Sequence, residues 1–256
     1  MANQLETLFT DIADAIRNKK GTTEKINALN FPSEIEALEV DDGDETLIYV
    51  IERNRSKLSL PNTITKIGNH AFAYFDMLTS IEIPSSVTSI GRFAFNYCSR
   101  LTSVKMPSTI KDIQYGAFSN CQQLTSIEIP ASVTSMEEDV FYNCKMLTSV
   151  IFQEECKITN LRQDAFCLCS ALTSIEIPAS VTSIGKAALK IGSATNKATI
   201  TFKSTTPPSI GSVVSGQTPF YADYLQEIRV PASAVETYKT ATNWSTYANY
   251  IVGYEE

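Results

Sequence analysis

A block of 23 residues, the step from Leu78 to Leu101, recurs through the middle of the chain almost letter for letter. Leu78-Thr-Ser-Ile81-Glu-Ile83-Pro84 returns as Leu101-Thr-Ser-Val104-Lys-Met106-Pro107 and as Leu124-Thr-Ser-Ile127-Glu-Ile129-Pro130. A fixed period of this length is typical of solenoids, in which each repeat buries its apolar face against the next. The repeat therefore predicts a rod of stacked turns that offers partners a broad surface more readily than a cleft.

Two further copies begin at Leu147 and Leu172, and the step between them is 25 residues. Two residues are therefore inserted in that turn, near Glu154-Glu155-Cys156. Upstream, Leu58-Ser-Leu60-Pro61 fits the block without its leading Leu. Such a degenerate first turn is usual at the end of a repeat array.

Each block predicts one short strand with a single buried face. Ile81 and Ile83 are apolar and two residues apart, with Glu82 between them, which is the spacing of a half-buried strand. Pro84 ends the strand, because proline cannot donate a hydrogen bond to a ladder. The second half of the block repeats an Ala-Phe pair and a Cys, as at Ala94-Phe95 and Cys98.

The string L-T-S-I-x-I-P-x-S-V-T-S-I-G-x-x-A-F-x-x-C, which residues 58–191 follow, resembles the leucine-rich repeats of the BspA family of bacterial surface proteins. The resemblance implies a curved, right-handed solenoid with a parallel sheet on one face, and a role in adhesion or protein binding rather than catalysis. With helical segments expected at both ends, the predicted fold class is an α+β repeat solenoid. We expect a segment at 1–44, the solenoid at 45–191 and a degenerate, capping region at 192–256.

Residues 1–44 lack the repeat and favour helices. Leu5, Phe9, Ile12 and Ile16 recur at three- and four-residue spacing, which places them on one apolar stripe of a helix that should end near Gly21. This stripe is a candidate assembly face. We expect a second short helix over residues 32–39 and a solvated linker over residues 41–45.

The strings Leu8-Phe9-Thr10-Asp11-Ile12 and Phe31-Pro32-Ser33-Glu34-Ile35 resemble an N-terminal attachment segment of tail-associated proteins of phages and prophages of Gram-positive bacteria. The resemblance implies that residues 1–44 dock to another virion subunit, and they can also join copies of the chain into a homo-oligomer. The first twenty residues have no continuous apolar core, so we expect no secretory signal peptide. The expected location is then the virion after synthesis in the cytoplasm, and the alternative is the bacterial cell surface.

At the other end of the chain the period is lost, although pieces of it remain. Ile200-Thr-Phe202 and Leu225-Gln-Glu-Ile228-Arg-Val230-Pro231 predict two more strands. Residues 232–244 predict a short helix that closes the stack. A cap is needed because an uncovered last turn would expose its core and an open strand edge.

Stacking in parallel brings equivalent positions of successive turns into columns. The outward strand column should hold Ser59, Glu82, Lys105, Glu128, Ile151, Glu176 and Arg229, in which opposite charges on neighbouring strands attract. Ile151 alone departs from this polar pattern. The Thr of each block should form a hydroxyl ladder of the same structural kind. The candidate partner contacts are Glu82, Lys105, Glu128, Ile151 and Glu176 on the strands, and Tyr74, Tyr97 and Tyr142 on the turns.

The remaining chemistry-bearing residues indicate no catalytic, metal or cofactor site. Four of the six cysteines share one column, where Phe75 and Gly192 stand in the flanking turns, so the column favours packing over metal binding or disulfides. His70 is the only histidine, and no motif supplies it with a nucleophile and an orienting acid. The net charge of -7 argues against a nucleic-acid partner. The sequence has no run of 18 apolar residues, so we predict no membrane span.

These observations favour a non-enzymatic binding protein with a protein partner. The first hypothesis is a tail-associated structural or receptor-binding component of a phage or prophage. The alternative is a BspA-like surface adhesin or host-interaction protein.

Overall fold

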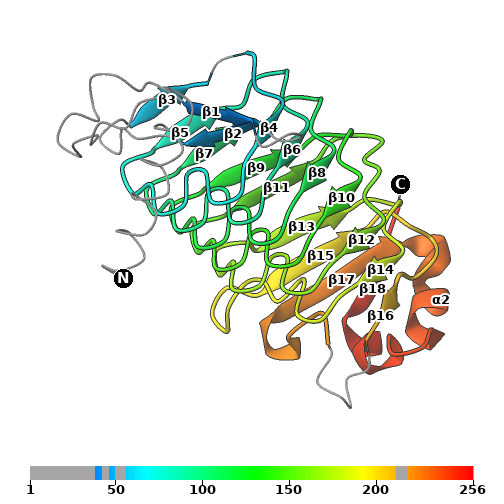
Figure 1. Ribbon diagram of the computed structural model, residues 1–256. Helices are drawn as coiled ribbons and strands as arrows, with labels where there is room; N and C mark the ends of the chain where they lie inside the picture. The colour runs from blue at the N-terminus through cyan, green and yellow to red at the C-terminus, as the bar shows by residue number, and fades with distance from the viewer. Residues whose placement is uncertain (1–37, 42–45, 50–55, 61, 212–217, 256) are drawn as a thin grey trace, which may run out of the picture.

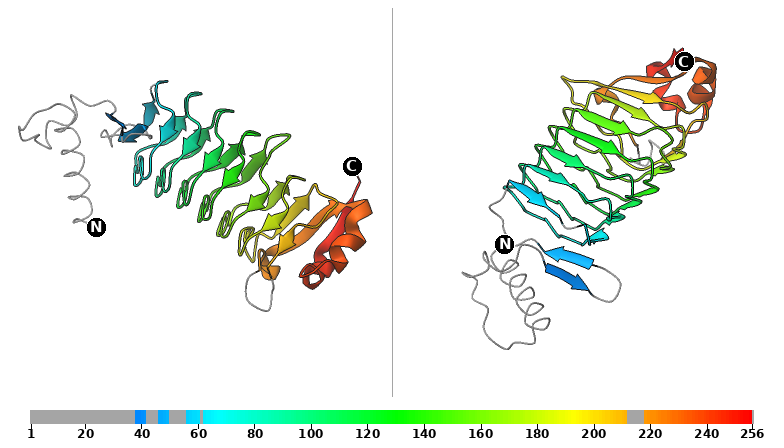
Figure 2. Two further views of the ribbon diagram at one scale, coloured as in Figure 1. Left: turned by 45° about the vertical axis from the view of Figure 1, so that its right-hand side comes forward. Right: turned by 90° about the horizontal axis from the view of Figure 1, so that it is seen from above.

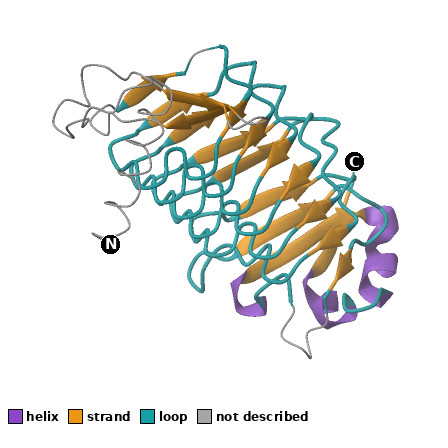
Figure 3. Ribbon diagram, in the orientation of Figure 1, coloured by secondary structure: helices purple, strands orange, loops and turns teal. Residues whose placement is uncertain are grey.

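The computed structural model describes residues 38–41, 46–49, 56–60, 62–211 and 218–255, and parallel strands stacked into a rod dominate them (Figure 1). Helices within these ranges are short and lie near the C-terminal end (Figure 3). The repeat solenoid is therefore confirmed as a β-solenoid of about eight turns. The α+β label is not confirmed, because the described part contains few helical residues.

The strands on the predicted face form one side of the rod, one strand per turn. Their side chains alternate between buried and exposed, as in β9, because one face of each strand covers the core. The strands are β3 (Lys57–Ser59), β5 (Ser80–Glu82), β7 (Ser103–Lys105), β9 (Ser126–Ile129), β11 (Ser149–Phe152), β13 (Ser174–Ile177), β15 (Ala198–Phe202) and β17 (Leu225–Pro231).

A second parallel ladder, which we did not predict, runs along another side of the rod. Its strands have two residues each, too few to show an alternation in the sequence. They are β4 (Lys66–Ile67), β6 (Ser89–Ile90), β8 (Asp112–Ile113), β10 (Ser135–Met136), β12 (Asn160–Leu161), β14 (Ser183–Ile184) and β16 (Ser209–Ile210). The parallel sheet that the resemblance implied is therefore present, and this second ladder accompanies it.

Both ladders are interrupted at the turn that carries the two extra residues. The long strands form one sheet in the order β11-β9-β7-β5-β3 and another that begins at β13, so β11 and β13 are not paired. The short strands form the sheets β10-β8-β6-β4 and β12-β14-β16. Within one turn, β11 therefore pairs with the preceding turn and β12 with the following one. The extra residues lie between β11 and β12. The longer connection explains how these two strands can pair with different turns.

A third side of the rod consists of turns, and here neighbouring repeats stay bonded along the described solenoid. The N–H of Phe141 donates to the carbonyl of Ala165 at 2.9 Å, across the level where the sheets break. Beneath these turns five phenylalanines stack in a continuous ladder, with ring centroids 4.9, 5.0, 5.5 and 5.4 Å apart: Phe72, Phe95, Phe118, Phe141 and Phe166. These contacts keep the rod continuous where strand pairing is lost.

The cysteine column belongs to the core, as predicted. The thiol of Cys121 donates to the carbonyl of Phe95 at 3.1 Å, and Cys98, Cys144 and Cys169 make the equivalent bond. All six cysteines are buried and none forms a disulfide. Packing therefore accounts for the column.

The C-terminal end is closed by a cap of short helices and one added strand (Figure 2). The buried side chains of Tyr238 and Trp244 cover the last turn, and the indole N–H of Trp244 donates to the carbonyl of Pro208 at 2.7 Å. Within the range 232–244 predicted to be helical, residues 235–240 form an α-helix and residues 232–234 a 3-10 turn. The elements are η3 (Ala222–Tyr224), η4 (Ala232–Ala234), α2 (Val235–Thr240), η5 (Ser245–Tyr250) and β18 (Ile251–Tyr254).

At the other end, an antiparallel hairpin precedes the first turn. It joins β1 (Leu38–Asp41) to β2 (Thr46–Tyr49), with Glu39 opposite Ile48. The helix expected up to residue 39 and the linker expected from residue 41 are wrong at these positions. The Asp42-Gly43 dipeptide between the strands favours a hairpin and was the missed signal. The proposed assembly face of Leu5, Phe9, Ile12 and Ile16 lies outside the residues that the structure describes.

Candidate functional site

The outward face of the long strands presents the predicted column of side chains. Glu82 lies opposite Lys105 in register, and Ile151 lies opposite Glu128. Beyond the interruption the same row continues as Glu176, Thr201 and Arg229. The structure thus brings the strand candidates into one row, divided into two parts between β11 and β13.

Most of this row is accounted for by contacts between neighbouring strands. Lys105 forms an ion pair with Glu82, and the amide of Gln153 donates to Glu128 at 2.6 Å. The hydroxyls of Thr102, Thr125 and Thr148 donate to the carbonyl one turn earlier at 2.9, 3.2 and 3.1 Å, which confirms the Thr ladder. These bonds align the turns, and exposed ion pairs of this kind contribute little stability.

Ile151 is the exception in the row. Its side chain is 55% exposed, in the position that charged residues occupy on neighbouring strands. Bulky aliphatic side chains prefer burial, and complete burial of one is worth about 1.5–3 kcal/mol. An exposed Ile in a row of polar side chains is therefore a contact that a partner can cover.

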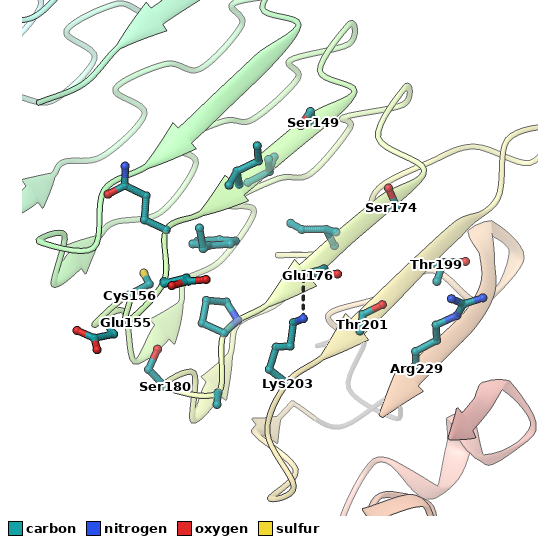
Figure 4. Close-up of a pocket in the computed structure, with 18 of the residues that line it drawn as sticks. Ser149, Glu155, Cys156, Ser174, Glu176, Ser180, Thr199, Thr201, Lys203 and Arg229 are labelled. Atoms are coloured by element: carbon teal, nitrogen blue, oxygen red, sulfur yellow. Dashed lines mark ion pairs between the residues drawn. The ribbon is translucent and has the colours of Figure 1, made fainter. Parts of the chain in front are cut away.

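A groove of about 1030 Å³ begins at Ile151 and follows the sheet toward the C-terminal cap. Its floor consists of outward side chains of β11, β13, β15 and β17, among them Ser149, Ser174 and Thr199. Figure 4 shows Glu155 and Ser180 at one end of the groove and Arg229 at the other. The groove coincides with the place where β11 and β13 are unpaired.

Some charged side chains of the groove have an ion-pair partner, and others do not. Glu176 forms an ion pair with Lys203 at 2.9 Å, and Arg229 forms one with Glu227 at 2.6 Å. Glu154 and Glu155, which come from the two-residue insertion, are exposed and form no ion pair within the described part of the chain. The end of the groove at the insertion is therefore acidic.

The three tyrosine candidates divide into two groups. Tyr74 and Tyr97 are 56% and 43% exposed, and their rings stack on each other with centroids 5.1 Å apart. Tyr142 is half-buried and belongs to the preceding position of the repeat, together with Asn96. The structure therefore does not bring Tyr142 into the exposed pair.

His70 lies in a turn and stacks on Phe93 with ring centroids 5.2 Å apart. Partial burial, with a smaller contribution from Arg92, lowers the pKa of His70 below its usual value, so the ring is neutral at pH 7. Burial raises the pKa of the Cys144 thiol to about 12, which removes its nucleophilic thiolate at neutral pH. No cluster of three metal-ligating side chains occurs among the described residues. No helix in the same part of the chain is long and apolar enough to cross a membrane.

Sequence reasoning missed several residues of the groove. Thr201 and Lys203 lie in the aperiodic region, where the repeat gives no alignment. The sequence indicated an insertion near Glu154 and Glu155 but gave these residues no role in a site. The 25-residue step was the signal that pointed to this location.

Solved structures of other repeat proteins are similar to this chain. A leucine-rich cell surface protein from Faecalibacterium prausnitzii A2-165 matches with a TM-score of 0.50 and 24% identity, over 78% of this chain and 69% of that one. The pneumococcal vaccine antigen PcpA matches with a TM-score of 0.50 and 19% identity, over 77% of this chain and 48% of that one. A leucine-rich repeat protein of T. pallidum matches with a TM-score of 0.42 and 21% identity, over 65% and 81%. At these identities the likeness to the first two structures shows the fold alone.

The family comparison is more specific than these structural matches. No curated protein sequence matches the chain. The model of the BspA type leucine-rich repeat region matches residues 52–160 and 88–214, which together make up more than half of the chain. Proteins built from such repeats are typically binding scaffolds, and they generally bind other proteins. The chain belongs to the BspA-type leucine-rich repeat family.

Proposed function

We propose that this protein is a non-enzymatic binding module that recognises a protein partner with the outward face of its long strands, at the groove between Ile151 and Arg229. The observation that carries this proposal is the exposed Ile151 at the one interruption of the long-strand ladder among β3–β17. Apolar contacts at the centre of an interface supply most of its binding energy, and a surrounding polar rim excludes water. The hydroxyls and ion pairs around Ile151 form such a rim.

The repeat family supports this proposal, since repeats of this type generally form protein-binding scaffolds. On β5, β7 and β9 the corresponding positions hold Glu82, Lys105 and Glu128, which contact side chains of neighbouring turns.

Binding of the labelled full chain to bacterial and epithelial cells tests this function. We expect that protease treatment of the cells abolishes binding and that Ile151→Glu weakens it at least tenfold, because a charge then replaces a contact worth about 1.5–3 kcal/mol. Met146→Glu is the matched control, since Met146 is also exposed but lies outside the groove. Binding that survives protease treatment and is lost on removal of surface polysaccharide contradicts the proposal.

We propose that the setting of this binding is the tail of a phage or prophage, with residues 1–44 attached to the particle and the solenoid directed outward. What supports this setting is the resemblance of the N-terminal strings to tail-associated proteins. The alternative, a BspA-like surface adhesin, is supported by the family of the repeats.

Purified virions from the source bacterium distinguish the two settings. In the tail setting they contain the chain, the double variant Leu5→Asp/Phe9→Asp is lost from them, and Ile151→Glu is retained. Labelling of the chain on intact cells in the absence of phage particles favours the adhesin.

A further inference from the structure

The groove differs from the regular turns of the sheet face because it contains an exposed apolar side chain and carboxylates without an ion pair. In the regular turns the outward residues are Ser, Thr or charged side chains that contact the neighbouring strand, as Lys105 contacts Glu82. In the groove an exposed Ile151 shares the lining with Glu154 and Glu155, whose carboxylates have no ion-pair partner within the described residues. A ligand of this site is therefore expected to supply both apolar surface and positive charge.

Electrostatics favours a basic ligand at the insertion end. The cationic side chains of the groove, Lys203 and Arg229, already pair with Glu176 and Glu227. The whole chain carries a net charge of -7. Long-range attraction thus brings basic segments toward the surface, and the free carboxylates hold them at one end.

The shape of the groove suits an extended chain. It spans the strands from β11 to β17, that is, two paired spacings of about 4.8 Å each and the wider gap between β11 and β13, a length that needs at least about four residues of extended peptide. Hydroxyls of Ser149, Ser174, Thr199 and Thr201 line the floor. A hydroxyl both donates and accepts hydrogen bonds, so this floor can bond the backbone of a peptide whatever its side chains.

We infer that the groove binds an extended peptide segment of the partner, in which a Lys or Arg contacts Glu154 and Glu155 and a nearby apolar side chain covers Ile151. This inference rests on the proposed protein-binding function and names the ligand of the same groove. Peptide recognition commonly combines backbone bonds that give affinity with a few side-chain contacts that give specificity.

A random heptapeptide library selected on the full chain supplies the probe. We expect the selected peptides to share one basic residue close to one aliphatic or aromatic residue. Their dissociation constants, measured by fluorescence anisotropy, should rise at least tenfold for Glu154→Gln/Glu155→Gln and for Ile151→Ser. Higher salt should weaken binding to the wild type and have less effect on the double Gln variant.

Matched control variants remove the same kinds of side chain at positions outside the groove. Asp76→Asn/Glu138→Gln also removes two exposed negative charges, and Met146→Ser also removes an exposed apolar side chain, yet none of these residues lines the groove. We expect both controls to change the dissociation constant by less than about twofold, consistent with interactions at distant sites being independent. Circular dichroism of every variant confirms that it is folded.

Acidic consensus peptides, or peptides that bind the groove variants as tightly as the wild type, overturn the inference. So does a selection that yields no peptide from folded protein. If cells still bind the chain through protein while the groove variants have no effect, the protein-binding function stands, and both the groove as its site and the peptide inference are wrong. If protease-treated cells bind as well as untreated ones, the function itself fails.

Discussion

At the scale of single residues, two positions recur with a left-handed backbone in the turns between residues 70 and 168. The second of these positions has φ values of 58–63° and is occupied by Tyr74, Tyr97, Asn120, Asn143 and Leu168. Asn tolerates this conformation because its side chain bonds locally, whereas other side chains with a β-carbon pay about 1–2 kcal/mol. Tyr74 and Tyr97 offset part of this cost by stacking on each other. Leu168 has no ring partner and is 39% exposed.

Leu168→Asn should therefore stabilise the protein by about 1 kcal/mol, because it relieves the left-handed backbone and loses little buried area. Equilibrium unfolding in urea measures the change. Leu168→Ala is the control, since it also shortens the side chain but lacks the amide that bonds locally in the left-handed conformation. An Asn variant no more stable than the Ala variant would mean that the backbone is not strained at this position.

The buried thiols make stability depend on pH in the alkaline range. Burial raises the pKa of Cys144 from 9.0 to about 12 and the pKa of Cys169 well above 9.0. Below pH 9 both states keep these protons, so the full stability is present. Above pH 9 the unfolded chain loses protons that the folded chain keeps, and the free energy of unfolding falls by about 1.4 kcal/mol per pH unit for each thiol.

Urea unfolding at pH 8, 9 and 10 should show this decline, with a shallower slope in Cys144→Ala than in the wild type. Parallel slopes would show that Cys144 titrates alike in the folded and unfolded states. A thiol reagent at pH 7 should label the six cysteines slowly in the folded protein and rapidly in urea, because only the unfolded state exposes them.

At the scale of elements, the unpaired edges of β11 and β13 should be visible in hydrogen exchange. The N–H groups of Thr199 and Lys203 donate to the carbonyls of Thr173 and Ile177, so this edge of β13 is satisfied by β15. Residues alternate along a strand, so the N–H groups of Ser174 and Glu176 point to the other edge, toward β11.

We expect the amides of Ser174 and Glu176 to exchange much faster than those of Thr199 and Lys203, because only the latter are held by a ladder. Exchange monitored by NMR resolves the four positions. Equal protection at all four would show that β11 and β13 pair in solution.

At the scale of the whole molecule, the two inserted residues determine where the ladders break. Deletion of Glu154 and Glu155 shortens the step from Leu147 to Leu172 to that of the other turns. We expect β11 then to pair with β13 and β10 with β12, since nothing else in the turn departs from the regular spacing. The amides of Ser174 and Glu176 should become protected.

The same deletion should abolish binding of peptides selected on the wild-type groove, because both the gap and the free carboxylates are removed. Insertion of two residues at the equivalent place in the preceding turn, after Pro130, provides a control for the length of the chain. If the deletion variant keeps both its exchange pattern and its peptide binding, the insertion is not the cause of the groove.

Much of the architecture could be predicted because the repeat encodes it locally. The alternation at Ile81, Glu82 and Ile83 assigns each side chain to the core or to solvent within three residues. The same local pattern gave the strand row, the Thr ladder and the cysteine column. Local patterns could not give the two-residue ladder, since β6 is too short to show a period. The period does place Tyr142 one position before the column of Tyr97, because Tyr97 directly precedes Cys98 whereas Tyr142 lies two residues before Cys144.

The sequence by itself determined the period of the solenoid, the strand faces and the position of the irregular turn. Tertiary structure alone decided that β11 pairs backward and β12 pairs forward, and hence that Ile151, Glu154 and Thr201 line one groove. The physical reason is that a side chain's face depends on its nearest neighbours in the chain, whereas strand pairing depends on how far successive turns are displaced along the rod. That displacement is set by the packing of whole turns against each other.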